Sequence, residues 1–167
     1  MHRIADGDGP VIDESQLDAL LSGRFQFINV WRNISAEHPV QKTPLGILDA
    51  RSCPLEDIIT FEIHYADRVG ENYLVSHSDS HRWLYWPKMT RDEAMLIKCW
   101  DSCGADFCEH HDQPNLSNST FCFHSAFEDE SDPPDAPDRE SIEVRTIAFF
   151  SDVPPTRDPR DPATSKL

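Results

Sequence analysis

Residues 120–150 decide the fold, and they read TFCFHSAFEDESDPPDAPDRESIEVRTIAFF. β-Branched and aromatic residues recur at both ends of this stretch, in Phe121–His124 and in Ser141–Phe150, as is typical of β-strands. The acidic connector between the two runs contains Pro133, Pro134 and Pro137, which cannot donate to a β-ladder. The sequence therefore predicts two strands that are joined by a loop and form a hairpin-like unit.

Outside this stretch, short apolar runs at intervals of roughly ten residues predict an all-β barrel or sandwich with minor helices. A helix is expected over Gln16–Leu21, with Ser15 as its N-cap, and another over Leu55–Thr60, opened by Pro54. Strands are predicted over Phe25–Trp31, Leu45–Asp49, Tyr73–His77, His81–Trp86 and Met95–Trp100.

The length and charge of the chain restrict its function. Its 167 residues suffice for one domain with a modest core, which we expect over residues 14–150, between a flexible N-terminus (1–13) and a disordered proline-rich tail (151–167). A formal net charge of −15 argues against nucleic acid or an anionic membrane as a partner. Without a secretory signal or a long apolar run, the five cysteines are expected to be reduced thiols in the cytoplasm.

A histidine ends the first predicted strand of the 120–150 stretch, and an Arg-x-Ser sequence enters the second. The imidazole of His124 is a good ligand for Fe(II), and two histidines with one carboxylate leave positions open for substrate and dioxygen. Arg139 and Ser141 suit a carboxylate such as that of 2-oxoglutarate, with Arg145 as the alternative anchor. A strand histidine bonded to the backbone and a surface arginine in an ion pair would give the same pattern.

The aromatic block HRWLYW offers a second set of candidates. His81 is the rival metal ligand, while Trp83 and Tyr85 are expected to line a substrate pocket. Lys98, in the next predicted strand, is a further candidate for a carboxylate anchor. More often such a lysine runs its stem along the core and exposes its amine.

A zinc site is the competing metal hypothesis. Cys103 and Cys108 are followed by His110, His111 and Asp112, with Cys122 and His124 downstream. Thiolates and imidazoles can bind Zn(II) tetrahedrally, but this spacing matches no common zinc finger. A solvated loop is therefore the favoured interpretation of the segment.

Five blocks occur in a fixed order: NVWRNI (29–34), PLGILDARS (44–52), HRWLYWPKMTRDEAMLIKCWDS (81–102), FHSAF (123–127) and PDRESIEVR (137–145). Together they resemble the fungal AsaB-type hydroxylase/desaturase family, which also includes CmcJ-like and NvfI-like oxidoreductases and the gibberellin desaturase. The resemblance implies a double-stranded β-helix (a jelly-roll-like barrel), with Fe(II) and 2-oxoglutarate as cofactors. It also implies a small-molecule substrate from fungal secondary metabolism.

One feature of that family is missing from the sequence. The family carries a His-x-Asp metal pair upstream of the block that begins here at Asn29, whereas His2 is followed by Arg3 and Ile4. We therefore expect the chain to lack the N-terminal part of the family. Two functions follow: a hydroxylase or desaturase with an incomplete metal triad, or a truncated, non-catalytic relative that binds a small molecule or a catalytic partner. A homo- or hetero-oligomer is compatible with both.

Overall fold

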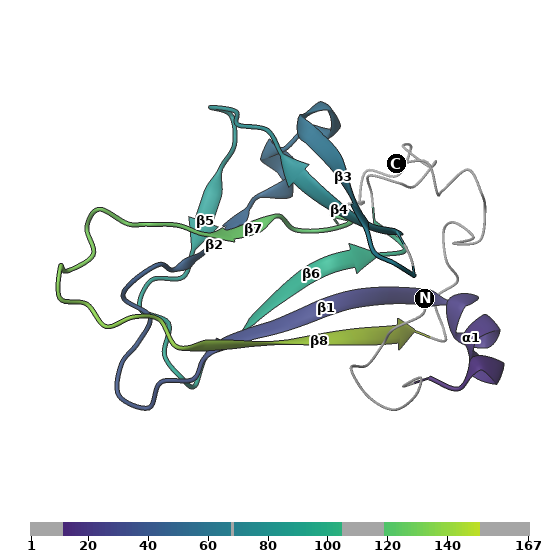
Figure 1. Cartoon of the computed structure of the whole chain (residues 1–167), viewed down its shortest axis with the longest axis horizontal. Helices are drawn as coiled ribbons and strands as arrows, with labels where there is room; N and C mark the ends of the chain where they lie inside the picture. The colour runs from purple at the N-terminus through teal and green to yellow at the C-terminus, as the bar shows by residue number, and fades with distance from the viewer. Residues whose placement is uncertain (1–11, 68, 105–118, 151–167) are drawn as a thin grey trace.

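The computed structural model describes residues 12–67, 69–104 and 119–150 (Figure 1). Within these ranges, helix α1 (Glu14–Leu21) and two 3-10 turns (Ala50–Ser52 and Leu55–Asp57) are too short to cross a membrane. The strands are β1 (Arg24–Asn33), β2 (Leu45–Leu48), β3 (Ile58–His64), β4 (Val69–Val75), β5 (Trp83–Tyr85), β6 (Met95–Asp101), β7 (His124–Ala126) and β8 (Ser141–Phe150). The prediction of a mainly β chain with minor helices is confirmed.

The strands form two three-stranded sheets and one hairpin, and every pairing is antiparallel. In the first sheet β1 lies between β6 and β8, and it pairs with β8 along its whole length, from Arg24 with Phe150 to Asn33 with Ser141. In the second sheet β2 lies between β5 and β7. Figure 1 shows this second sheet above the first, with the β3–β4 hairpin at one end.

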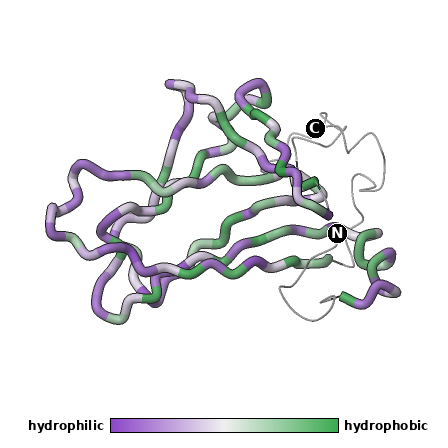
Figure 2. Tube along the Cα trace, in the orientation of Figure 1, coloured by the Kyte–Doolittle hydropathy of each residue, from purple (hydrophilic) through white to green (hydrophobic). Residues whose placement is uncertain are grey.

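The prediction that the strands within residues 120–150 form a hairpin-like unit is wrong. β7 pairs with β2 and β8 pairs with β1, so the two strands belong to different sheets. The acidic, proline-rich loop between them crosses from one sheet to the other, and Figure 2 shows it as mostly hydrophilic. β8 has ten residues, so it can form more backbone hydrogen bonds with the ten residues of β1 than with the three residues of β7.

The two helix predictions also need correction. Asp13 rather than Ser15 caps α1, because the Asp13 carboxylate accepts a hydrogen bond of 2.9 Å from the Ser15 amide. The helix predicted over Leu55–Thr60 is wrong, since β3 begins at Ile58 after a single 3-10 turn. The β-branched residues at the start of β3 favour the extended backbone and stop the helix.

The core lies between the two sheets and is small. Its buried members come from both sheets and from the loops beside them: Trp31, Val40, Leu45, Met89 and Ile97. On the outer face of the first sheet, by contrast, Leu96 and Val144 are 69% and 52% exposed, and both pair with Val30.

A buried charge cluster joins β1 to β6. The fully buried Asp101 carboxylate accepts two bonds from Arg24 (3.0 and 2.6 Å), one from the Gln26 amide (2.7 Å) and one from Lys98 (3.1 Å). The Cys103 backbone amide donates a further bond of 3.0 Å. Burial raises the pKa of Asp101, but these hydrogen bonds outweigh it and lower the pKa to about 2. The cluster therefore holds a charged carboxylate at neutral pH.

Candidate functional site

A cleft of about 400 Å³ opens between the two sheets, beside β7. It is lined by Phe27 on β1, Glu71–Tyr73 on β4, Cys99 and Trp100 on β6, and residues 121–124. Aromatic rings, thiols, an amide, a carboxylate and an imidazole therefore meet in one place. A largely apolar cleft with a few converging polar groups is the usual form of a small-molecule site.

An irregularity in β6 shapes one wall of this cleft. Phe27 pairs with Trp100 while the next residue, Ile28, pairs with Lys98, so Cys99 is an extra residue in β6. Such a β-bulge re-aims side chains, and here it brings both Cys99 and Trp100 to the cleft. Burial raises the pKa of the Cys99 and Cys122 thiols, which keeps both protonated at neutral pH.

His124 lines the cleft with one ring nitrogen fixed. Its Nδ1 lies 3.0 Å from the backbone carbonyl oxygen of Cys122. A carbonyl oxygen only accepts, so Nδ1 carries the proton, and in the neutral imidazole Nε2 presents a lone pair. Nε2 has no hydrogen-bond partner among the described residues. A backbone carbonyl on one nitrogen is a common way to orient a histidine whose other nitrogen binds a metal.

His81, the rival metal ligand, lies outside the cleft lining. Its side chain is 3% exposed, and its Nε2 is 2.9 Å from the Asp57 carboxylate. The Asp57 carbonyl accepts a bond of 2.8 Å from the Ser76 amide. Because Asp57 precedes β3 and Ser76 follows β4, these contacts close the base of the β3–β4 hairpin.

The described residues contain no group of three or more His, Cys, Asp or Glu side chains that could hold a metal ion. His124 by itself does not fit an iron centre, which needs further ligands. Most of the segment considered for zinc, including Cys108 and His110–Asp112, lies outside the described residues.

A family model described as an oxidoreductase/YMDC permease-like domain matches residues 10–149. The chain belongs to this family. Similar curated proteins include "Aspirochlorine biosynthesis protein N" of Aspergillus oryzae, 37% identical over 138 residues, and "Hydroxylase/desaturase asaB" of Aspergillus flavus, 30% identical over 152 residues. The matches cover 81% and 83% of this chain, but 52% and 61% of the two relatives.

A solved structure of the iron and alpha-ketoglutarate-dependent endoperoxidase NvfI shares the fold, with a TM-score of 0.66 and 27% identity. The superposition covers 82% of this chain and 46% of NvfI. The predicted resemblance to the AsaB/NvfI-type hydroxylase/desaturase family and the predicted partial double-stranded β-helix are confirmed. The chain spans about half the length of the curated relatives it matches.

In this hydroxylase/desaturase fold, the residues predicted to bind the 2-oxoglutarate carboxylate lie on or beside β8. Ser141 pairs with Asn33 and Arg145 pairs with Asn29. Paired residues of an antiparallel sheet share a face, and alternate residues along a strand do too. Ser141 and Arg145 therefore share the sheet face of Phe27, which lines the cleft.

The two arginines differ in their contacts. Arg139 donates a hydrogen bond of 2.6 Å to the Thr43 carbonyl, and its guanidinium lies 5.6 Å from the ring centroid of Trp31. The Arg145 side chain is 87% exposed and lies 3.8 Å from the Glu143 carboxylate. Arg139 is thus engaged in holding the loop before β8, while Arg145 keeps most of its donors for a ligand.

Replacing each arginine separates these roles. Arg139→Ala is expected to lower the free energy of unfolding by about 1–2 kcal/mol, because a charged hydrogen bond and a cation–π contact are lost. Arg145→Ala is expected to change stability by less than about 0.5 kcal/mol, since its side chain is exposed. Urea denaturation followed by circular dichroism measures both. Equal losses in the two variants would contradict this distinction.

Trp83 and Tyr85 lie on the opposite face of the second sheet from His124. Ile47 on β2 pairs with both His124 and Leu84, so Leu84 shares the face of His124. The neighbours of Leu84 on either side point away from that face. That these two rings line the substrate pocket stays a prediction, and such a pocket would be separate from the His124 cleft.

A second cavity, of about 320 Å³, includes Tyr85 in its lining. The Tyr85 ring packs edge-on against Phe127, with ring centroids 5.1 Å apart, and its hydroxyl donates a hydrogen bond of 3.2 Å to Asp129.

Lys98, the other proposed carboxylate anchor, donates one hydrogen bond to Asp101 and another, of 3.2 Å, to the Ser119 carbonyl. Its partner Ile28 is on the sheet face opposite Phe27, so Lys98 points away from the cleft.

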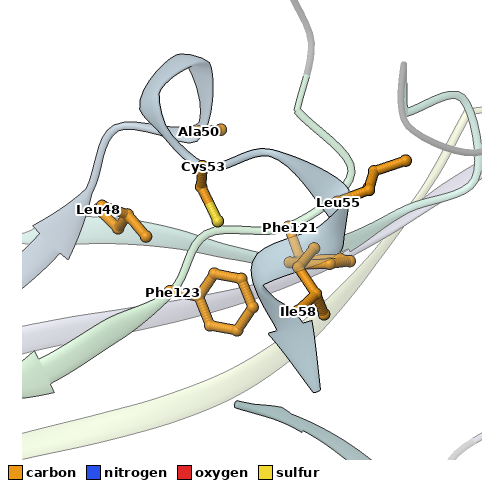
Figure 3. A pocket seen from close by; sticks show the side chains of 7 residues that line it. All are labelled: Leu48, Ala50, Cys53, Leu55, Ile58, Phe121 and Phe123. Carbon is orange, nitrogen blue, oxygen red and sulfur yellow. The ribbon is translucent and has the colours of Figure 1, made fainter. Parts of the chain in front are cut away.

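The sequence did not single out the aromatic wall of the His124 cleft. Phe121 stacks against both Tyr73 and Trp100, which come from β4 and β6. Phe121 and Phe123 also line a small hollow of about 10 Å³, together with residues from β2 to β3. Figure 3 shows the side chains that line it. The alternation in Phe121–Phe123 was a visible signal for a strand-like segment, but it did not reveal the partners of these rings.

Proposed function

We propose that this chain is part of an Fe(II)/2-oxoglutarate-type oxidoreductase that hydroxylates or desaturates a small molecule in fungal secondary metabolism. The observation that carries the proposal is the oriented imidazole of His124, with Nδ1 bonded to the Cys122 carbonyl and Nε2 available in a cleft. The family supports it, since similar proteins include "Alpha-ketoglutarate-dependent dioxygenase phiK" and the dioxygenase nvfI.

Each residue then has a defined task. His124 would contribute one metal ligand, and the exposed guanidinium of Arg145 would bind the 2-oxoglutarate carboxylate. Ser141 lies on the same sheet face, while Arg139 holds the loop before β8. Asn29 donates a hydrogen bond of 2.8 Å to Glu143, which holds that carboxylate 3.8 Å from the Arg145 side chain. When bound, iron would allow dioxygen to act as the oxidant, and 2-oxoglutarate would provide two electrons and be converted to succinate and carbon dioxide. The remaining metal ligands would come from outside the described residues.

A non-catalytic subunit that binds a small molecule or a partner is the second candidate. One observation favours it: the described residues form a cleft for a ligand but no complete set of metal ligands. Such a protein would keep the cleft and lose the oxidation.

Succinate formation separates the two candidates. The full chain is incubated with Fe(II), ascorbate, 2-oxoglutarate and air, and succinate is measured by mass spectrometry. The oxidoreductase proposal expects succinate above a blank that contains iron and ascorbate without protein, and expects it to cease when iron is omitted. Succinate at the level of the blank would overturn the oxidoreductase proposal and support the non-catalytic one.

A further inference from the structure

We propose that the cleft beside His124 binds an apolar, ring-containing small molecule whose hydroxyl or amino group donates a hydrogen bond to Glu71. The inference rests on the proposed function in that it names the substrate class of the same site. The binding itself requires no metal and no turnover, so it can be tested separately.

The apolar part of the ligand is defined by a rigid aromatic wall. The Phe121 ring is stacked on Tyr73 at 5.1 Å with an interplanar angle of 3°, and on Trp100 at 6.4 Å and 18°. Phe123 meets Phe121 edge-on, at 5.3 Å and 86°. Phe121 is 9% exposed, so its ring is covered by these neighbours and supports the half-buried rings of Tyr73, Trp100 and Phe123 from behind. Flat ring systems gain most from such a surface because they stack without distortion.

The size of the cleft agrees with this class. About 400 Å³ lies within the range of pockets that hold drug-sized molecules. Phe27, from β1, adds a fifth aromatic ring to the lining. A single small acid would leave most of this aromatic surface in contact with water.

The polar end of the cleft lies on β4. The hydroxyl of Tyr73 donates to Oε1 of Glu71, which orients the carboxylate and leaves Oε2 as an acceptor within the described residues. Burial, together with the bond to Glu71, raises the pKa of Tyr73 far above its ordinary value, so the phenol remains the donor in this pair. A ligand that meets Glu71 must therefore supply an O–H or N–H group.

The charges on β4 exclude an anionic group at this end. Glu71 lies directly opposite Glu62 on β3, and the whole chain carries a net charge of −15. A ligand carboxylate placed here would be repelled and would leave its acceptors without donors. The arginine on β8 has the opposite sign, so a neutral donor-bearing substrate and an anionic co-substrate would be directed to different strands.

Two matched ligands test the inference without iron. 2-Naphthol has two fused rings and one O–H donor, whereas 2-methoxynaphthalene has the same rings and no donor. Calorimetry on the full metal-free chain is expected to give a Kd about tenfold lower for 2-naphthol, as a hydrogen bond to a charged acceptor predicts. Glu71→Ala is expected to remove this preference while leaving the Kd of 2-methoxynaphthalene within about twofold.

Glu62→Ala is the matched control, because it removes the same charge from the facing strand and leaves Glu71 in place. It is expected to keep the preference for 2-naphthol. Equal affinities for the two ligands in the unmodified chain, no saturable binding of either, or a preference that survives Glu71→Ala would each overturn the inference.

The naphthol titration and the succinate assay can fail independently of each other. His81→Ala is expected to bind 2-naphthol within about twofold of the unmodified chain, because His81 lies outside the cleft lining. If the chain makes no succinate but selects 2-naphthol through Glu71, the proposed oxidation fails and the ligand class stands. If succinate forms without that selection, the ligand class fails alone.

Discussion

Asp101→Ala is expected to lower the free energy of unfolding by about 3–5 kcal/mol, the cost of breaking a buried ion pair by removing one partner. The Asp101 side chain is fully buried and accepts bonds from Arg24, Gln26 and Lys98. Without it, two cations and an amide lose their shared acceptor between β1 and β6. Urea denaturation followed by circular dichroism at neutral pH measures the loss.

Asp138→Asn is the control for this experiment. The charged groups of Asp138 and Lys42 lie 2.6 Å apart, but the two side chains are 89% and 49% exposed. Loss of this ion pair is therefore expected to lower the free energy of unfolding by less than about 1 kcal/mol. If the two aspartate variants lost similar stability, the structural role of the buried cluster would be contradicted.

The contribution of Asp101 also depends on pH. Its pKa is about 2 in the folded protein, below the value of about 3.9 for an unfolded aspartate. A carboxyl whose pKa is lowered by folding stabilises the protein fully above the unfolded pKa, and the contribution is lost as the pH falls through the folded pKa. The stability difference between the unmodified chain and Asp101→Asn is therefore expected to shrink between about pH 4 and pH 2. A difference that stays constant over this range would contradict the assignment.

His124→Ala is expected to reduce succinate formation at least about 100-fold, since even residues that only orient metal ligands cost 10–100-fold when mutated. The imidazole would be lost from the cleft, and no other described histidine lines it. Succinate is measured by mass spectrometry at equal concentrations of protein whose circular dichroism spectrum matches that of the unmodified chain.

His81→Ala provides the comparison between the two candidate ligands. His81 binds Asp57 at the base of the β3–β4 hairpin, so its loss is expected to lower stability and to leave the specific activity of the folded protein within about twofold. The reverse result, with activity lost in His81→Ala and kept in His124→Ala, would show that His81 is the ligand.

Much of the fold follows from local sequence. Ser141–Phe150 was predicted with the bounds that β8 has, because prolines and charges flank a continuous β-branched and aromatic run. The pairing of β8 with β1 was not predicted, since the two strands are more than a hundred residues apart and local patterns do not encode partners. The helix expected at Leu55–Thr60 failed because the pairing of β3 with β4 outweighed a favourable helix start.

The candidate site divides in the same way. His124, Arg139 and Ser141 were candidates because their side chains suit a metal and a carboxylate, and the family resemblance, rather than their spacing, favoured them over an ordinary strand histidine and surface arginine. Trp100 and Tyr73 do not, because their place in the cleft depends on a β-bulge in β6 and on the position of β4. The sheet face on which the side chains of an aromatic strand such as Trp83–Tyr85 lie depends on the register of that strand with its neighbours. The sequence does not reveal this register.

Anaerobic titration of the purified chain with Fe(II), followed by calorimetry with and without 2-oxoglutarate, tests the central claim most directly. The claim is that the Nε2 lone pair of His124 serves a metal that binds together with this co-substrate. It predicts micromolar Fe(II) binding that tightens with 2-oxoglutarate, disappears in His124→Ala and persists in His81→Ala. The absence of Fe(II) binding, or binding that is unchanged in His124→Ala, would contradict it.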